Sequence, residues 1–369
     1  MPKITKKERL KQIAQRRETY TTRVFMMWKD VMRERIEQTS KLVSFKFYRG
    51  DLHYHSTYSD GVATVHETKE WIDRAGLDFF FVTDHGTVNQ KRYCQKYENL
   101  WWGQEPGTQY HHLGILGLDR KYSPRGNLAY DYRKVKELGG YPFIPHPAGW
   151  FPSTRYNDEQ KDSLNLLGEE FAIEVINGAN QVFDCFDITD EMTIELWDKH
   201  LCQGKRVTGL GNTDAHLPQA IGDVWTGVFC EPLTKENVID ALWKGHCFAS
   251  DAPLVNIMLT PLLPALKDKD SLKQRGVTGL NGAQMGDIVY LPAGSTVALH
   301  YECADSRGLS EIRIIKDGQC IEKISQIDNV KAEDTIEIRF EGGKSYCRLE
   351  CFAFDQRRAY TNPIYIWES

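Results

Sequence analysis

Residues 79–85 read Phe79-Phe80-Phe81-Val82-Thr83-Asp84-His85, an apolar run that ends in polar side chains and an imidazole. Four bulky apolar residues in a row are typical of a strand that is buried on both faces of a sheet. Comparable runs recur between residues 44 and 230, and segments with helical spacing separate them. This alternation of strands and helices predicts an α/β fold with a parallel sheet, either open or closed into a barrel.

Seven strands are expected in this part of the chain, at residues 44–55, 77–85, 111–118, 141–146, 171–177, 207–214 and 225–230. Thr64 and Glu67 have the spacing of a capping box, which predicts a helix that begins there. Further helices are expected at residues 131–138, 191–202 and 236–242, the last with Thr234 as its N-cap.

The pattern of hydrophobic and polar residues changes at both ends of this region. Val24, Met27, Trp28 and Val31 have helical spacing near the N-terminus, which predicts a helix docked on the body or on a second subunit. After residue 252 helical periods vanish and short β-rich runs separated by Gly and Asp take over. We therefore expect an N-terminal helical arm (1–45), an α/β domain (46–252) and an all-β, sandwich-like domain (253–369).

Composition narrows the class of protein. The chain has 369 residues, 41% of them hydrophobic, and no apolar run approaches the length of a membrane helix. No apolar stretch follows the charged residues at the N-terminus, so a secretory signal peptide is not expected. The nine cysteines include no C-x-x-C, and we therefore expect reduced thiols in the cytoplasm. The net charge of -5 divides into a basic start and an acidic body, which argues against general nucleic-acid binding.

Histidines and carboxylates gather where the predicted strands stop. His53 and His55 form an H-x-H that places both side chains on one face of the first strand. The other members of the cluster are Asp60, His85, Glu105, His112, His146, Asp214 and His216. Imidazoles mixed with carboxylates suit zinc, manganese or iron, and nine ligands exceed the needs of one ion. The pattern predicts two or three divalent metal ions, whereas His66, His200, His246 and His300 are expected to be structural.

These motifs resemble the PHP (polymerase and histidinol phosphatase) superfamily of metal-dependent hydrolases over about residues 46–250. The resemblance rests on Asp51-Leu52-His53-Tyr54-His55-Ser56, Ser59-Asp60-Gly61, Thr83-Asp84-His85, Gly103-Gln104-Glu105, Ile144-Pro145-His146-Pro147 and Gly211-Asn212-Thr213-Asp214-Ala215-His216. The tail Thr361-Asn362-Pro363-Ile364-Tyr365 resembles the CehA/McbA-like branch. The resemblance implies a distorted (β/α)7 barrel with a trinuclear site at the carboxyl ends of its strands.

The resemblance also implies which residues hold each ion. His53, His55, Glu105 and Asp214 would hold the first, and Glu105 would bridge to a second held by His112 and His146. Asp60, His85 and His216 would hold the third, with Asp60 where some family members have histidine. His111 is adjacent to His112 and could replace it. Asp51 and Asp84 would either orient ligands or cap loops. The catalytic residues implied are His53, His55, Asp60, His85, Glu105, Asp214 and His216.

The function implied is a phosphoesterase that cleaves a small phosphomonoester or nucleotide with a metal-bound hydroxide. Two alternatives stay open: an amide, ester or carbamate hydrolase with the same ions, and a non-catalytic binding protein with structural metals. No G-x-S-x-G, Walker loop or G-x-G-x-x-G occurs in the sequence. Arg120, Lys121, Arg125 and Arg155 are candidate phosphate-binding cations or simply solvated charges. A homo-oligomer formed through the N-terminal helix is a further expectation.

Overall fold

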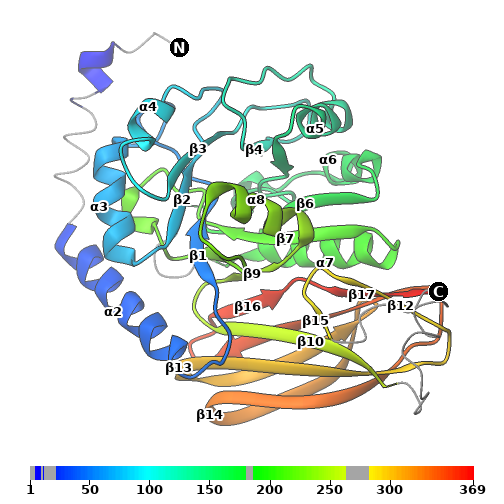
Figure 1. Cartoon of the computed structure of the whole chain (residues 1–369). Helices are drawn as coiled ribbons and strands as arrows, with labels where there is room; N and C mark the ends of the chain where they lie inside the picture. Colours follow the sequence, from blue (N-terminus) through cyan, green and yellow to red (C-terminus); the bar gives the residue numbers. More distant parts are fainter. Residues whose placement is uncertain (1–4, 10, 12–21, 180–185, 263–281) are drawn as a thin grey trace.

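The computed structural model describes residues 5–9, 11, 22–179, 186–262 and 282–369 (Figure 1). The N-terminal part of the predicted helical arm and Cys185 therefore lie largely or wholly outside the described residues. The other eight cysteines are unpaired. Among the described residues, no helix has both the length and the apolar character needed to cross a membrane.

The α/β part is built on a sheet that contains both parallel and antiparallel pairs. Its strands are β1 (Tyr48–Asp51), β2 (Phe79–Val82), β3 (Leu100–Gln104), β4 (Gly114–Leu116), β5 (Tyr141–Phe143), β8 (Trp225–Val228) and β9 (Cys247–Ser250). β1, β2 and β3 are parallel, whereas β4 runs antiparallel to both β3 and β5, and β8 runs antiparallel to β1. The expectation of a wholly parallel sheet is therefore wrong for β4 and β8.

A separate parallel pair, β6 (Glu170–Asn177) and β7 (Arg206–Asn212), lies between the two ends of this sheet. Isolated parallel bridges join Ile144 to Ile173 and Tyr54 to Ala215. The first bridge connects the end of β5 to β6, and the second connects the segment after β1 to the segment after β7. The carboxyl ends of β1, β5, β6 and β7 thus lie near one another.

The helices match the expected caps. They are α2 (Thr22–Ser40), α3 (Val65–Ala75), α4 (Lys91–Cys94), α5 (Leu128–Glu137), α6 (Asp158–Asp162), α7 (Ile188–Cys202) and α8 (Lys235–Lys244), with short 3-10 helices at Pro152–Thr154, Ser163–Leu166 and Pro218–Ala220. Thr64 and Glu67 form the predicted capping box of α3, and Thr234 caps α8 through the backbone N–H of Asn237.

β3 is a strand where the sequence predicted a loop around Gly103-Gln104-Glu105. Its five residues include two tryptophans, and Trp102 pairs in register with Val82 of β2. Gly103 permits the close pairing with β4, because a Cβ at this position would lie 2.6 Å from the carbonyl oxygen of Ile115. Glu105 therefore directly follows the last residue of a strand and is not part of a long loop.

The β-rich part comprises β10 (Leu254–Leu262), β11 (Ala283–Gln284), β12 (Ile288–Leu291), β13 (Thr296–Lys316), β14 (Gln319–Arg339), β15 (Lys344–Ala353), β16 (Arg358–Thr361) and β17 (Ile364–Glu368). Two of the short β-rich runs after residue 252, at residues 296–302 and 311–316, belong to one long strand with irregular register between Ala304 and Glu311. β16 pairs antiparallel with β9, so that hydrogen bonding continues across residue 252. One buried apolar cluster likewise contains both Phe80 and Ile312.

The helix α2 lies along both parts of the chain (Figure 1). Met32 and Ile36 are buried against the body, while Val24, Met27 and Val31 are 55%, 60% and 40% exposed. The body therefore packs on the face of α2 with Met32 and Ile36, and of the stripe predicted from the sequence Trp28 also packs against it.

Candidate metal centre

Nine predicted site residues come together at one edge of the sheet. His53, His55 and Asp60 follow β1, His85 follows β2, Glu105 follows β3, His146 follows β5, and Asp214 and His216 follow β7. His112 precedes β4 and still reaches the same edge, because β4 runs antiparallel to its neighbours. Three overlapping sets place their nitrogen and oxygen atoms within 4.8 Å of one another: His55, Asp60, His85 and His216; His53, His55 and Asp214; His85, Glu105 and His112.

The innermost set is buried. Nε2 of His53 and Nε2 of His55 are 3.1 Å apart, and Oδ1 of Asp214 lies 3.2 and 3.1 Å from these two atoms. Burial lowers the pKa of His53, but Asp214, Glu105 and Glu174 outweigh it and hold that pKa well above its usual value. Two imidazole nitrogens and a carboxylate that point at a common position favour positive charge there, either as a proton or as a metal ion.

Glu105 is the centre of the cluster. Its Oε1 lies 2.9 Å from Nδ1 of His112 and 3.3 Å from Nε2 of His146, and its Oε2 lies 3.0 Å from Nδ1 of His85. Oε2 is buried and has no hydrogen bond of good geometry to any described residue. A buried carboxylate oxygen without a donor, surrounded by imidazoles, fits a bridging metal ligand.

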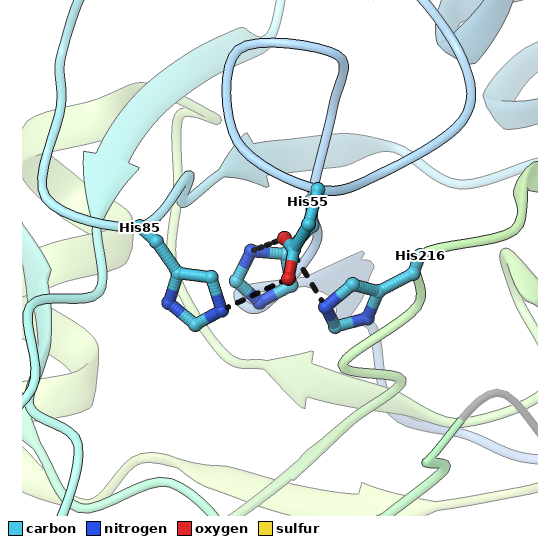
Figure 2. Close-up of side chains that lie close together, drawn as sticks. His55, His85 and His216 are labelled. Atoms are coloured by element: carbon cyan, nitrogen blue, oxygen red, sulfur yellow. Dashed lines mark ion pairs between the residues drawn. The ribbon is translucent and has the colours of Figure 1, made fainter. Parts of the chain in front are cut away.

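The outer set is more accessible. The side chain of Asp60 is 56% exposed, and its oxygens lie 3.6 Å from Nε2 of His85 and 3.4 Å from Nε2 of His216. Figure 2 shows the rings of His55, His85 and His216 converging from different segments of the chain. The Nδ1–H of His216 donates to the backbone carbonyl of Asp214, so the lone pair of its ring is on Nε2, the atom that faces Asp60.

Glu174 supports the cluster, and the sequence did not identify this function. Its Oε1 accepts from Nδ1 of His53 at 2.8 Å, which leaves Nε2 of His53 as the acceptor that faces the site. The same carboxylate accepts from the amides of Asn177 and Asn212 and from the backbone N–H of His146. A glutamate inside the apolar run 171–176 was the available signal, because a buried charge needs a partner.

Asp51 and Asp84 cap loops instead of orienting ligands. Asp51 accepts hydrogen bonds from the backbone N–H groups of His53 and Thr213 and from the hydroxyl of Thr213. Asp84 accepts from the backbone and hydroxyl groups of Ser56 and Ser59. Within the described chain, neither carboxylate hydrogen-bonds to an imidazole, so both act by fixing the backbone beside the ligands.

His111 faces away from the cluster. Its Nε2–H donates to the backbone carbonyl of Gln160 at 2.8 Å, and its ring packs against Tyr156. Burial lowers the pKa of His111 to about 4, which leaves it neutral near pH 7. The structure therefore brings His112, and not His111, to Glu105. His66, His200, His246 and His300 also lie outside the three sets of converging atoms.

The backbone is strained at two members of the cluster. His146 has a φ of 34° and Asp214 a φ of 49°, in the region that non-glycine residues avoid. Such positions cost on the order of 1–3 kcal/mol and are found most often at functional sites. The strain is consistent with side chains that are placed for a ligand at the expense of local stability.

A cavity of about 270 Å³ opens over the cluster. Trp150 lines it, 37% exposed, with its ring stacked on His112 at 6.0 Å between centroids. Imidazole and carboxylate donors, two levels of burial and an open cavity together make a cluster that can bind divalent metal ions and leave room for a ligand.

Comparison with known proteins finds similarities of low sequence identity. No family model matches the chain. The DNA polymerase/3'-5' exonuclease PolX of Bacillus subtilis (strain 168) is 23% identical over 224 residues, covering 53% of this chain and 39% of PolX. This chain therefore spans well under half the length of that relative.

Two solved structures resemble the fold. One is a two-domain protein from Bacteroides vulgatus containing a predicted PHP-like metal-dependent phosphoesterase, with 17% identity, a TM-score of 0.44, and coverage of 86% of this chain and 95% of that one. The other is the lesion-specific endonuclease PfuEndoQ from Pyrococcus furiosus, with 17% identity, a TM-score of 0.38, and coverage of 53% and 56%. The CehA/McbA-like branch is not confirmed by these similarities.

Proposed function

We propose that this protein is a PHP-type metal-dependent phosphoesterase that hydrolyses a small phosphomonoester or nucleotide. The observation that carries the proposal is the convergence of six histidines and three carboxylates beneath one open cavity. Ion pairs that only stabilise a fold do not need so many neutral donors around one bridging carboxylate. The distorted (β/α)7 barrel, the domain limits at residues 45 and 252 and the CehA/McbA-like branch belong to the same proposal.

The ligands divide among the ions as follows. His53, His55 and Asp214 would hold the first ion with Glu105, and Glu105 would be shared with a second ion held by His112 and His146. Asp60, His85 and His216 would hold a third. The assignment is supported by distances of 2.9–3.3 Å between Glu105 and the imidazoles of His53, His55, His112 and His146. His55 Nδ1 also lies 3.8 Å from Asp60, so the outer set adjoins the innermost set.

Divalent ions at these positions supply a water of lowered pKa and neutralise charge on the phosphoryl oxygens. The remaining work belongs to the chain. Glu174 orients His53, and the backbone carbonyl of Asp214 orients His216. Trp150 covers His112 on the cavity side and excludes water from part of the site. Asp60, His85 and His216 lie at the mouth, where a phosphoryl group would enter.

A nuclease is the second candidate, and the similarity to PolX favours it. Tyr58, on the segment between His55 and Asp60, also packs against Tyr93 and accepts a hydrogen bond from Arg92. Exposed aromatic rings interleaved with cations are suited to single-stranded nucleic acid. The acidic body of the chain weighs against this candidate.

One experiment separates these candidates. The purified protein is analysed for bound metal and assayed against phosphomonoesters, phosphodiesters, carboxyl esters, carbamates and a short single-stranded DNA, with and without chelator. Chelator-sensitive release of phosphate from monoesters is the expected result. Hydrolysis of carboxyl esters or carbamates alone would overturn the phosphoesterase, and cleavage of DNA alone would replace it by the nuclease. Bound metal without turnover of any substrate would favour the binding protein.

A further inference from the structure

A second hollow adjoins the metal cluster on the side away from Trp150. Its volume is about 530 Å³, and Lys121, Tyr122, Ser123 and Pro124 form one wall. His85, Glu105 and His112 line both this hollow and the cavity over the cluster. The cluster therefore borders both the cavity and the second hollow. A ligand bound to the ions can extend into the second hollow, whose volume is in the range of small-molecule sites.

The segment that carries Lys121 is fixed to the cluster through Gln104. The amide of Gln104 donates to the carbonyl of Arg120 at 3.0 Å and accepts from the backbone N–H of Tyr122 at 2.8 Å. Gln104 is fully buried and immediately precedes Glu105. A further hydrogen bond from the hydroxyl of Tyr122 to Asp131 holds the segment from the other side. Lys121 thus occupies a defined place relative to Glu105.

The ammonium group of Lys121 lies on the cluster side of this segment. A Cβ built on Gly86 would be 4.0 Å from Nζ of Lys121, and Gly86 directly follows His85. Lys121 has no ion pair or side-chain hydrogen bond to any residue that the structure describes. Arg120, Arg125 and Arg155, the other cations that the sequence suggested, line neither hollow. Arg125 is instead placed over the ring of Tyr130.

We propose that Lys121, with Ser123 beside it, forms an anion-binding subsite for a second negatively charged group on the substrate. The inference rests on the proposed function and adds a substrate class: phosphomonoesters whose alcohol portion carries a carboxylate or a further phosphate. The phosphoryl group lies on the ions, and the alcohol portion extends past Gly86 into the second hollow. The ammonium of Lys121, beside Gly86, then discriminates against substrates with a neutral alcohol portion.

The test compares phenyl phosphate with 4-carboxyphenyl phosphate, using wild type, Lys121→Met and the matched control Arg120→Met. We expect Lys121→Met to lower kcat/KM for the carboxylated ester about 10-fold and that for phenyl phosphate less than about 2-fold. Arg120→Met should leave kcat/KM unchanged for both esters. Lys121→Arg should restore part of the preference for the carboxylated ester. Because the carboxylate also alters the intrinsic reactivity of the ester, each variant is compared with wild type on the same substrate.

A binding measurement keeps the subsite testable if neither ester is hydrolysed. Calorimetry of phenylphosphonate and 4-carboxyphenylphosphonate with metal-loaded protein should show a preference for the carboxylated compound that Lys121→Met abolishes. Equal losses for both compounds, or no preference in wild type, would overturn the subsite. A preference in binding without any phosphate release would retain the subsite and reject the phosphoesterase.

Discussion

The buried charges of α2 and those of the metal cluster are compensated in different ways. On α2, Nζ of Lys29 lies 2.6 Å from Asp223, and Arg35 reaches Asp305 at 2.8 Å and Asp355 at 2.6 Å. Each of these carboxylates faces a side chain with a permanent positive charge. In the cluster, Glu105 and Asp214 face imidazoles, which are neutral unless they are protonated.

The kind of group that faces each carboxylate distinguishes charges that stabilise the fold from charges that can bind a ligand. A fixed guanidinium or ammonium neutralises its carboxylate whatever the solution contains, so α2 is held against both parts of the chain permanently. Imidazoles leave the negative charge of the cluster to be balanced by protons or by metal ions, which exchange with solvent. Changes in α2 should therefore alter the stability of the fold, whereas changes in the cluster should alter metal binding.

The largest effect is expected for Asp214→Asn, which removes a charge from the innermost set. Activity should fall by about 10³-fold or more, equivalent to about 4 kcal/mol, because the first ion loses an anionic ligand. Metal content, measured by elemental analysis, should fall with it, while the thermal unfolding of the metal-free protein changes little. His66→Gln, at an exposed position outside the cluster, is the control and should retain both metal and activity.

The next effect is on stability and concerns Arg35→Met. Removing the guanidinium leaves the buried carboxylate of Asp305 without its cation, which costs about 3–5 kcal/mol. Denaturant unfolding should show this loss, while the metal bound per folded molecule stays the same. Arg33→Met on the same helix breaks only an exposed pair with Glu37 and should cost less than about 0.5 kcal/mol. A comparable loss in both variants would contradict the contrast between these positions.

A smaller effect should follow Glu174→Gln, which touches the cluster only through its neighbours. The amide keeps the size of the side chain but weakens the hold on Nδ1 of His53. Metal affinity should decrease by about 10- to 100-fold, as is usual for such supporting groups. Glu170→Gln lies on the same strand, β6, in an ion pair with Arg206 at 2.6 Å, and is the matched control. Competition with a chelator of known affinity measures both variants, and equal affinities would refute this function of Glu174.

These contrasts also show which features sequence patterns could reveal. The run Phe79–Val82 and the capping box at Thr64 identified β2 and α3, because burial and caps are local properties. The orientation of β4 was not predictable, since three residues, Gly114–Leu116, carry no signal of direction. His112 was nevertheless predicted, through the resemblance to the PHP superfamily, and the reversed direction of β4 explains how its side chain reaches the edge where the other strands end.

Properties that depend on partners distant in sequence were missed. Glu174 and His53 are 121 residues apart, and they meet because β6 pairs with β7 and the segment after β7 bridges to Tyr54, beside His53. The join between β9 and β16 similarly links residues more than 100 positions apart. Val24, Met27 and Val31 have the same spacing as a buried stripe, yet the body contacts the other face of α2. Long-range pairing decides these cases, and local periodicity contains no information about it.

The smallest effect is expected for His200, an imidazole that belongs neither to the ion pairs of α2 nor to the metal cluster. It is fully buried in α7 with its ring edge-on to Phe171, and burial lowers its pKa to about 4. Between pH 4 and 6.5 the unfolded chain binds a proton at this residue that the folded chain excludes, so the free energy of unfolding rises with pH across this window. His200→Phe should remove about 1–2 kcal/mol of the difference between pH 5 and pH 7. Unfolding by denaturant at both values measures this difference, with His300→Phe, at a half-buried position of β13, as the control. If the variant retained the whole pH dependence, His200 would have to be protonated in the folded protein as well as in the unfolded chain.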